Sequence, residues 1–120
     1  MFDFERLEVY KMSKLYYLEI SKIIESKKEL NFATINQLSR SSLSIVLNIA
    51  EGSGRFSNAD KRRFYIISRG SVFETVSIAD VLTDKGVLSS ADFQKIHNDA
   101  EIISKKLWHL IKRLEAPPRL

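Results

Sequence analysis

The spacing of apolar positions along the chain predicts four helices. Apolar residues recur at intervals of three and four over about 4–26, 33–51, 57–84 and 89–115, and this period places them on one face of a helix. Polar turns separate the four stretches, and both prolines lie close to the C-terminal end. Because helices joined by short turns pack beside their neighbours, we expect an all-α, antiparallel up-down four-helix bundle that forms a single domain over residues 1–120.

The fourth stretch has the most regular pattern. It begins at Ser89 or Ser90, with Asp92 in the first turn, which is typical of a helix N-terminus. Its apolar residues follow strict three–four spacing: Phe93, Ile96, Ala100, Ile103, Leu107, Leu110 and Leu114. This spacing predicts the buried seam of a bundle helix.

The first stretch carries a broad apolar arc that includes Val9, Tyr16 and Ile20. Leu7, Leu15 and Leu18 fall outside this arc, and three such leucines on one helix indicate a second buried contact. The third stretch opens with Ser57 three residues before Asp60, an N-cap pattern, and Gly86 is suited to its C-terminal cap.

The third stretch is apolar on more than one side. Phe64, Ile67 and Ile78 point one way, Tyr65, Val72, Val76 and Ala79 another, and Ile66 and Phe73 a third. A helix that is apolar on several sides is buried on several sides, which a four-helix monomer of this size does not achieve. We therefore expect the chain to form a homo-oligomer, with this helix at the boundary between subunits.

A polar stripe on the second helix faces a similar stripe on the third. One side of the second helix carries no lysine and consists of Gln37, Ser41, Ser44, Asn48 and Glu51, and the third helix carries Ser68, Ser71 and Glu74 at spacings of three. One interpretation makes Asn48, Glu51 and Glu74, with Arg69, a site that binds or reacts. We favour the other, a structural polar seam of paired groups between the two helices, because buried polar groups must be hydrogen-bonded.

Gly52-Ser53-Gly54 follows this stripe directly. Glycines supply the left-handed conformation that often ends helices, so we expect them to terminate the second helix. A phosphate-binding loop would need a GxxxxGK[ST] motif after a strand, and no strand precedes these glycines.

The composition narrows the classes of function. The chain has 120 residues, no cysteine and a net charge of +4, so it can bury a core but holds no disulfide framework. The N-terminus does not resemble a signal peptide and no apolar run is long enough to cross a membrane, so we expect a cytoplasmic protein without a membrane partner. His97 and His109 lie about 120° apart around one helix, and we expect neither a metal nor another cofactor.

Cations gather at one end of the predicted bundle. The turn between the second and third helices and the end of the fourth share that end, which we call the basic pole: Arg55, Lys61, Arg62, Arg63, Lys112 and Arg113. The helix macrodipole accounts for Lys112 and Arg113 at a C-terminus but not for Lys61–Arg63 near an N-terminus. Because clustered cations bind phosphates, we expect any nucleic acid to contact this pole.

Two motifs, NIAEGSGR (48–55) and RGSVFE (69–74), resemble those of the bacterial family of four-helix-bundle proteins. These are also called 23S rRNA intervening-sequence proteins, and some are labelled S23 ribosomal proteins. The resemblance extends over nearly the whole chain and implies a homopentameric helical barrel. One branch, the accessory proteins of diversity-generating retroelements, resembles a basic scaffold that engages a reverse transcriptase and RNA.

Two functions fit these patterns. The first is a non-catalytic, self-assembling module that contacts RNA or other nucleic acid through the basic pole. The alternative is a purely structural or protein-interaction scaffold, an adaptor without nucleic acid. Sequence-specific DNA readout is disfavoured because the supposed recognition helix is mostly apolar beyond its first turn. An enzyme is disfavoured because no strong nucleophile is accompanied by a base.

Overall fold

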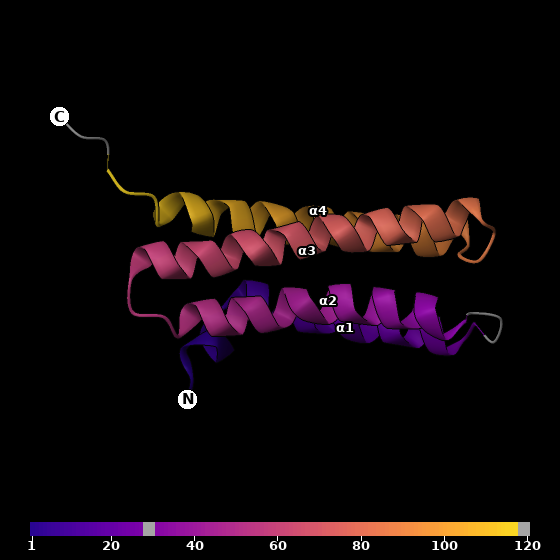
Figure 1. Ribbon diagram of the computed structural model, residues 1–120, viewed down its shortest axis with the longest axis horizontal. Helices are drawn as coiled ribbons and strands as arrows, with labels where there is room; N and C mark the ends of the chain where they lie inside the picture. Colours follow the sequence, from indigo (N-terminus) through magenta and orange to yellow (C-terminus); the bar gives the residue numbers. More distant parts are fainter. Residues whose placement is uncertain (28–30, 118–120) are drawn as a thin grey trace.

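The computed structural model describes residues 1–27 and 31–117, and this part of the chain contains helices and no strand (Figure 1). A short 3-10 helix, η1 (Asp3–Arg6), precedes four α-helices. These are α1 (Glu8–Glu25), α2 (Phe32–Ser53), α3 (Asn58–Asp84) and α4 (Ser90–Arg113). The prediction of an all-α chain with four helices is therefore confirmed.

Side-chain caps fix where three of the helices begin. Asn31, Ser57 and Ser89 each accept a hydrogen bond from the backbone N–H three residues ahead, at 2.8, 3.1 and 3.0 Å respectively. Each bond satisfies a backbone donor that has no partner within its helix. The starts predicted at Ser57 and Ser89 are confirmed, whereas the cap at Asn31 was not anticipated.

The apolar period predicted one continuous first helix over residues 4–26, but the structure divides this stretch into η1 and α1. Leu7 has an extended backbone, with φ −76° and ψ 124°, and separates η1 from α1. Helix η1 turns aside to pack on α2, and Leu7 itself packs against the core. Periodicity missed this break because the spacing of three between Phe4 and Leu7 is also that of a continuous helix.

The four α-helices lie along a molecule of 55 × 33 × 22 Å. Figure 1 shows the end of α2, the start of α3 and the end of α4 at one end of the molecule, near the N-terminus. The end of α1, the start of α2, the end of α3 and the start of α4 lie at the opposite end. Contacts join α1 to α2, α2 to α3, α3 to α4 and α4 back to α1.

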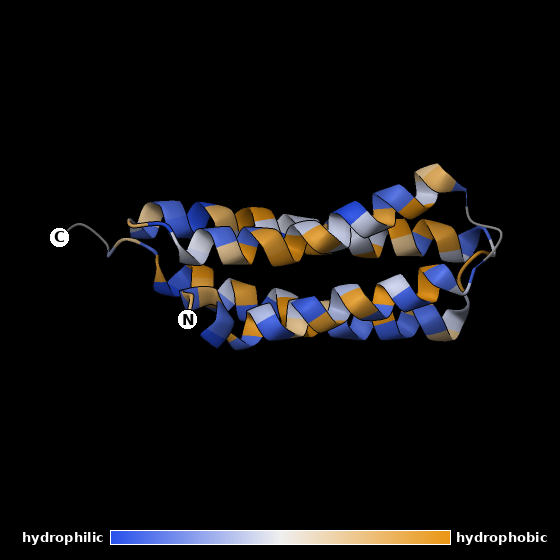
Figure 2. Cartoon of the chain, turned by 90° about the horizontal axis from the view of Figure 1, so that it is seen from below, coloured by the Kyte–Doolittle hydropathy of each residue, from blue (hydrophilic) through white to orange (hydrophobic). Residues whose placement is uncertain are grey.

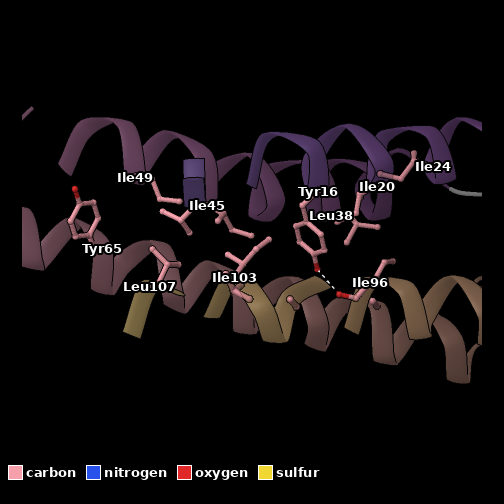
Figure 3. Packing of buried hydrophobic residues seen from close by; sticks show 14 of the residues in the cluster. Tyr16, Ile20, Ile24, Leu38, Ile45, Ile49, Tyr65, Ile96, Ile103 and Leu107 are labelled. Atoms are coloured by element: carbon pink, nitrogen blue, oxygen red, sulfur yellow. Dashed lines mark hydrogen bonds between the residues drawn. The ribbon is translucent and has the colours of Figure 1, made fainter. Parts of the chain in front are cut away.

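The core lies between these helices. Figure 3 shows Tyr16, Ile20, Leu38 and Ile45 from α1 and α2 facing Ile96, Ile103 and Leu107 from α4. Each isoleucine or leucine buried in this way stabilises the fold by roughly 1.5–3 kcal/mol relative to an exposed one. The regular seam predicted for α4 is buried at Ile96, Ala100, Ile103 and Leu107, with Ile111 as an unpredicted addition.

A hydrogen bond from a buried tyrosine crosses this core. The Tyr16 hydroxyl donates a 3.1 Å hydrogen bond to the carbonyl oxygen of Ile96, which links α1 to α4 (Figure 3). Burial, and to a smaller extent the charge of Asp99, raises the pKa of Tyr16 well above its ordinary value. Leu15 and Leu18, in contrast, remain 59% and 46% exposed within the single chain.

Hydrophobic residues recur along every helix and do not form one long apolar segment (Figure 2). Within residues 1–27 and 31–117, no helix combines the length and the apolar character needed to cross a membrane.

Helix α2 ends within the Gly52-Ser53-Gly54 stretch, as predicted, but neither glycine there takes the expected left-handed conformation. The helix continues to Ser53, and Gly54 has a right-handed φ of −89°. A Cβ atom on Gly52 would lie 2.9 Å from Cβ of Phe64 and 3.0 Å from the Tyr65 ring. The glycine therefore allows α2 and α3 to approach closely. Gly86, with φ +78°, does take the left-handed conformation after α3, as predicted.

Helix α3 buries only part of its apolar surface within the chain. Phe64, Tyr65 and Val72 are buried, whereas Ile66 and Phe73 remain 45% and 57% exposed. The third apolar side predicted for this helix, formed by Ile66 and Phe73, is thus open to solvent in the single chain.

Candidate nucleic-acid interface

The polar seam joins α2 to α3 through hydroxyl groups. The hydroxyl oxygens of Ser44 and Ser71 lie 2.8 Å apart, and the Asn48 amide donates to both the hydroxyl and the carbonyl of Ser44. One turn along, Thr75 donates a 2.9 Å bond to the Ser41 hydroxyl. Because Thr75 and Ser41 are buried, these bonds fix how the two helices align.

The structure places Glu51 and Glu74 outside this seam. Both side chains are exposed, and Glu51 pairs with Arg55 at 2.8 Å. They line the rim of a surface depression that also includes Ser44 and Asn48. A carboxylate is costly to bury, and serine and threonine hydroxyls can satisfy both helices without one.

Thr75 is the seam residue that sequence reasoning missed. It follows Ser68 and Ser71 at helical spacing, so periodicity could have included it. The Ser68 hydroxyl also crosses between the helices, donating a 2.8 Å bond to the carbonyl oxygen of Ile45. On α3 the seam is therefore formed by the predicted Ser68 and Ser71 together with the unpredicted Thr75.

The basic pole forms where the end of α2, the start of α3 and the end of α4 meet (Figure 1). Three carboxylates lie against its six cations: Glu51 pairs with Arg55, Asp60 lies 3.7 Å from Arg63, and Glu115 pairs with Lys112 at 3.0 Å. The cluster as a whole is therefore positively charged.

Lys61 contacts the C-terminus of α2, a structural role that the sequence did not predict. Its ammonium group donates a 2.7 Å hydrogen bond to the carbonyl oxygen of Ser53, the last residue of α2. A cation at a helix C-terminus is favoured by the macrodipole. The position of Lys61 near the N-terminus of α3 is therefore explained by the stability of α2, whose C-terminus the ammonium group contacts.

Arg55 and Arg63 are held by one aromatic ring. Their guanidinium carbons lie 4.5 Å and 4.7 Å from the ring centroid of Phe64. Their side chains remain 40% and 59% exposed. The ring and the flanking carboxylates orient both guanidinium groups while leaving donors open to solvent.

Arg62, Lys112 and Arg113 complete the basic pole. Within the described residues, Nε of Arg62 is buried without a hydrogen-bond partner, and no carboxylate lies within ion-pair distance of the exposed Arg113. Lys112, by its hydrogen bond and charge, lowers the pKa of Glu115, and Arg62 adds to this shift. The charge of Arg62 therefore acts on the end of α4.

An exposed aromatic residue at this pole was not anticipated. Phe56 lies in the turn between α2 and α3, directly after Arg55, and its side chain is fully exposed. The sequence pattern predicted the cluster of cations but not an exposed ring among them. The signal was present, since a phenylalanine between a helix end and an N-cap serine has no periodic partner to pack against.

Within the same described residues, no cluster of three or more histidine or acidic side chains is arranged to hold a metal ion.

Comparison with known proteins connects this chain to one family. A family model described as 23S rRNA-intervening sequence protein matches residues 5–109. A solved structure from Bacteroides thetaiotaomicron, described as a protein with unknown function from the S23 ribosomal protein family, is similar with a TM-score of 0.80 and 26% identity. That similarity covers 87% of this chain and 98% of the other. No curated protein matches the sequence.

Proposed function

This chain belongs to the 23S rRNA-intervening sequence protein family, and from that premise we propose that it is a non-catalytic, self-assembling helical module that contacts RNA through its basic pole. The observation that carries the proposal is the meeting of cations from α2, α3 and α4 at one end, with fewer carboxylates beside them. Such a surface attracts phosphates without reading sequence. The family description names ribosomal RNA, which favours RNA as the polyanion.

Self-assembly is supported by an apolar surface on α3 and α4, which we call the Ile66–Phe73–Trp108 face. These three side chains are 45%, 57% and 44% exposed and line one depression with Gly70. Arg69 lies over the Phe73 ring at 4.9 Å and donates to the carbonyl oxygen of Ser104. The arginine thus keeps the Phe73 ring in place at the surface.

Gly70 adds a second argument for this face. A glycine inside a helix is about 1 kcal/mol less favourable than alanine, and here, apart from the adjoining residues and backbone of α3 itself, no atom lies within 4 Å of where its Cβ would be. Packing within the single chain gives no reason for the missing side chain. A neighbouring copy that approaches the backbone of α3 at this point would give one.

In our proposal the up-down bundle forms a closed homo-oligomer through this face. The resemblance to homopentameric barrels favours five copies. Assembly would repeat the basic pole in each subunit, and linked binding sites raise avidity without new contacts.

A protein-interaction scaffold without nucleic acid is the second candidate, because the same apolar face could receive a partner protein. The salt dependence of binding separates the two. Single-stranded RNA, structured RNA and duplex DNA should be titrated by fluorescence anisotropy at two salt concentrations. Four phosphate contacts to a single strand predict that affinity falls by about 50-fold for a fourfold increase in salt. Absence of RNA binding at the lower salt concentration would refute the RNA proposal and leave the scaffold.

A further inference from the structure

Phe56 is the most exposed aromatic side chain at the basic pole, with a relative exposure of 104%. Leaving such a ring in water forgoes a sizeable hydrophobic stabilisation. Single exposed apolar residues are common on protein surfaces, so exposure alone does not indicate a site. Three further observations distinguish this one.

The first is that the backbone around Phe56 is fixed. On one side, the N–H of Arg55 donates a 3.1 Å bond to the carbonyl oxygen of Gly52, which extends α2 by a turn. On the other, Ser57 caps α3 through its side chain and accepts from the N–H of Lys61 with its carbonyl oxygen. The ring therefore projects from a short turn anchored on both sides.

The second is the arrangement of the neighbouring cations. Arg55 precedes Phe56 directly, and its guanidinium is fixed by Glu51 at 2.8 Å and by the Phe64 ring. Arg63 lies on the same Phe64 ring. Arg55, which adjoins Phe56 in the chain, and Arg63 are thus oriented arginines that can donate to anionic oxygens.

The third is charge. Among the described residues, the carboxylates in contact with this cluster are each paired with a cation, and Lys61, Arg62 and Arg113 remain without a carboxylate partner. A stacking ring beside an excess of cations is the combination that binds single-stranded nucleic acid, in which bases stack on aromatic side chains and phosphates meet arginine or lysine. In a duplex the bases already stack on one another and do not offer a free face.

We propose that Phe56 is a stacking platform for an unpaired RNA base, with Arg55 and Arg63 contacting the adjacent phosphates. The proposal rests on the proposed function and adds to it a substrate class. The pole favours single-stranded segments or loops over fully paired RNA.

The test compares Phe56→Leu, which keeps an apolar side chain of similar size but removes the ring, with Phe56→Trp, which keeps the ring. Phe32→Leu is the matched control, because Phe32 is also exposed, at 83%, but begins α2 at the opposite end of the molecule. Each full-length variant is titrated with a labelled unstructured 12-nucleotide RNA and with a duplex RNA of the same length.

Loss of one stacked base predicts that Phe56→Leu weakens single-strand binding by about 5- to 150-fold. Duplex binding should change by less than about twofold, and Phe32→Leu should leave both unchanged. Phe56→Trp should retain single-strand affinity, and stacking should quench the fluorescence of the new tryptophan relative to the parent protein, whose single tryptophan is Trp108.

Two results would overturn the platform while the proposed function stands. One is that the wild-type protein binds both RNAs and that Phe56→Leu binds each of them with unchanged affinity. The other is an equal loss for both RNAs together with a changed oligomer mass, which would assign the ring to a subunit contact. If the wild-type protein binds neither RNA, the proposed function itself fails, and the platform with it.

Discussion

The Thr75 hydroxyl on α3 donates a 2.9 Å hydrogen bond to the Ser41 hydroxyl on α2, where both side chains are buried. Replacing Thr75 by valine keeps the volume but removes the donor and leaves the Ser41 hydroxyl without this partner. We expect Thr75→Val to lower the free energy of unfolding by about 1–2 kcal/mol, measured by urea denaturation at fixed protein concentration.

Thr83→Val is the control for this change. The Thr83 hydroxyl donates to the carbonyl oxygen of Ala79 within α3 itself, so the same substitution does not affect the contact with α2. Equal losses in the two variants would show that the bond between helices adds nothing.

The close approach at Gly52 predicts that a single methyl group will destabilise the chain. Alanine is the better helix former by about 1 kcal/mol, but its Cβ would lie 2.9 Å from Cβ of Phe64, and overpacking costs roughly 1–3 kcal/mol. We expect Gly52→Ala to lower the melting temperature. Gly54→Ala, whose Cβ would meet only a carbonyl oxygen at 3.6 Å, should not. A Gly52→Ala protein that melts at or above the wild-type temperature would refute the close packing.

The Ile66–Phe73–Trp108 face should govern assembly. Phe73 is 57% exposed, so Phe73→Glu should preserve the helical content of the chain while charge opposes association. Light scattering at micromolar concentration should show an oligomer for the wild type and a lower mass for the variant. Val81→Glu, at a 54% exposed position on the same helix, should keep the wild-type mass. A monomeric wild type would reject assembly altogether.

The basic pole should determine the salt dependence of RNA binding. Arg62→Gln with Arg113→Gln removes two charges and disrupts no ion pair seen among the described residues. If both contact phosphates, the slope of log affinity against log salt should become less steep by about 1.4 for single-stranded RNA. The control is Lys22→Gln with Lys85→Gln, an equal charge change at the opposite end. Equal effects of the two pairs would indicate a response to net charge and not to this pole.

The Tyr16 hydroxyl predicts a loss of stability in alkali. Burial raises the pKa of Tyr16 in the folded state above its unfolded value, so the folded state retains a proton that the unfolded chain releases above about pH 10. Stability is therefore full below that pH and falls as pH rises beyond it, by up to about 1.4 kcal/mol per pH unit. Tyr16→Phe should be less stable at neutral pH and should reduce this alkaline slope. If stability fell equally steeply with alkaline pH in Tyr16→Phe and in the wild type, Tyr16 would not be the group responsible.

Much of the fold follows from local patterns. The serines at 57 and 89 act through the backbone a few residues away, and the α4 seam depends on spacing alone, so both could be read from the sequence. The break at Leu7 and the role of Gly52 could not, because each depends on a contact with a different helix. Sequence patterns report which side of a helix is apolar, but not how near the next backbone lies.

The candidate site was predictable only in part, for the same reason. Clustering of the cations followed from the order of the helices. The contacts of the individual cations could not be predicted in this way. Lys61 binds a carbonyl eight residues earlier in the chain, and the Phe64 ring holds Arg55. The exposure of Phe56 was signalled only by its place between a helix end and an N-cap serine, and not by its hydrophobicity.

The Cβ atom of Phe64 lies against Gly52, and its ring contacts the guanidinium groups of Arg55 and Arg63. Separating α2 from α3 would therefore also disperse the two guanidinium groups. By thermodynamic linkage, a polyanion that binds both arginines must resist that separation, since it binds the closed helix pair more tightly than the open one. RNA would then act as a clamp, and amide protons near the α2–α3 junction should exchange with solvent more slowly when it is bound.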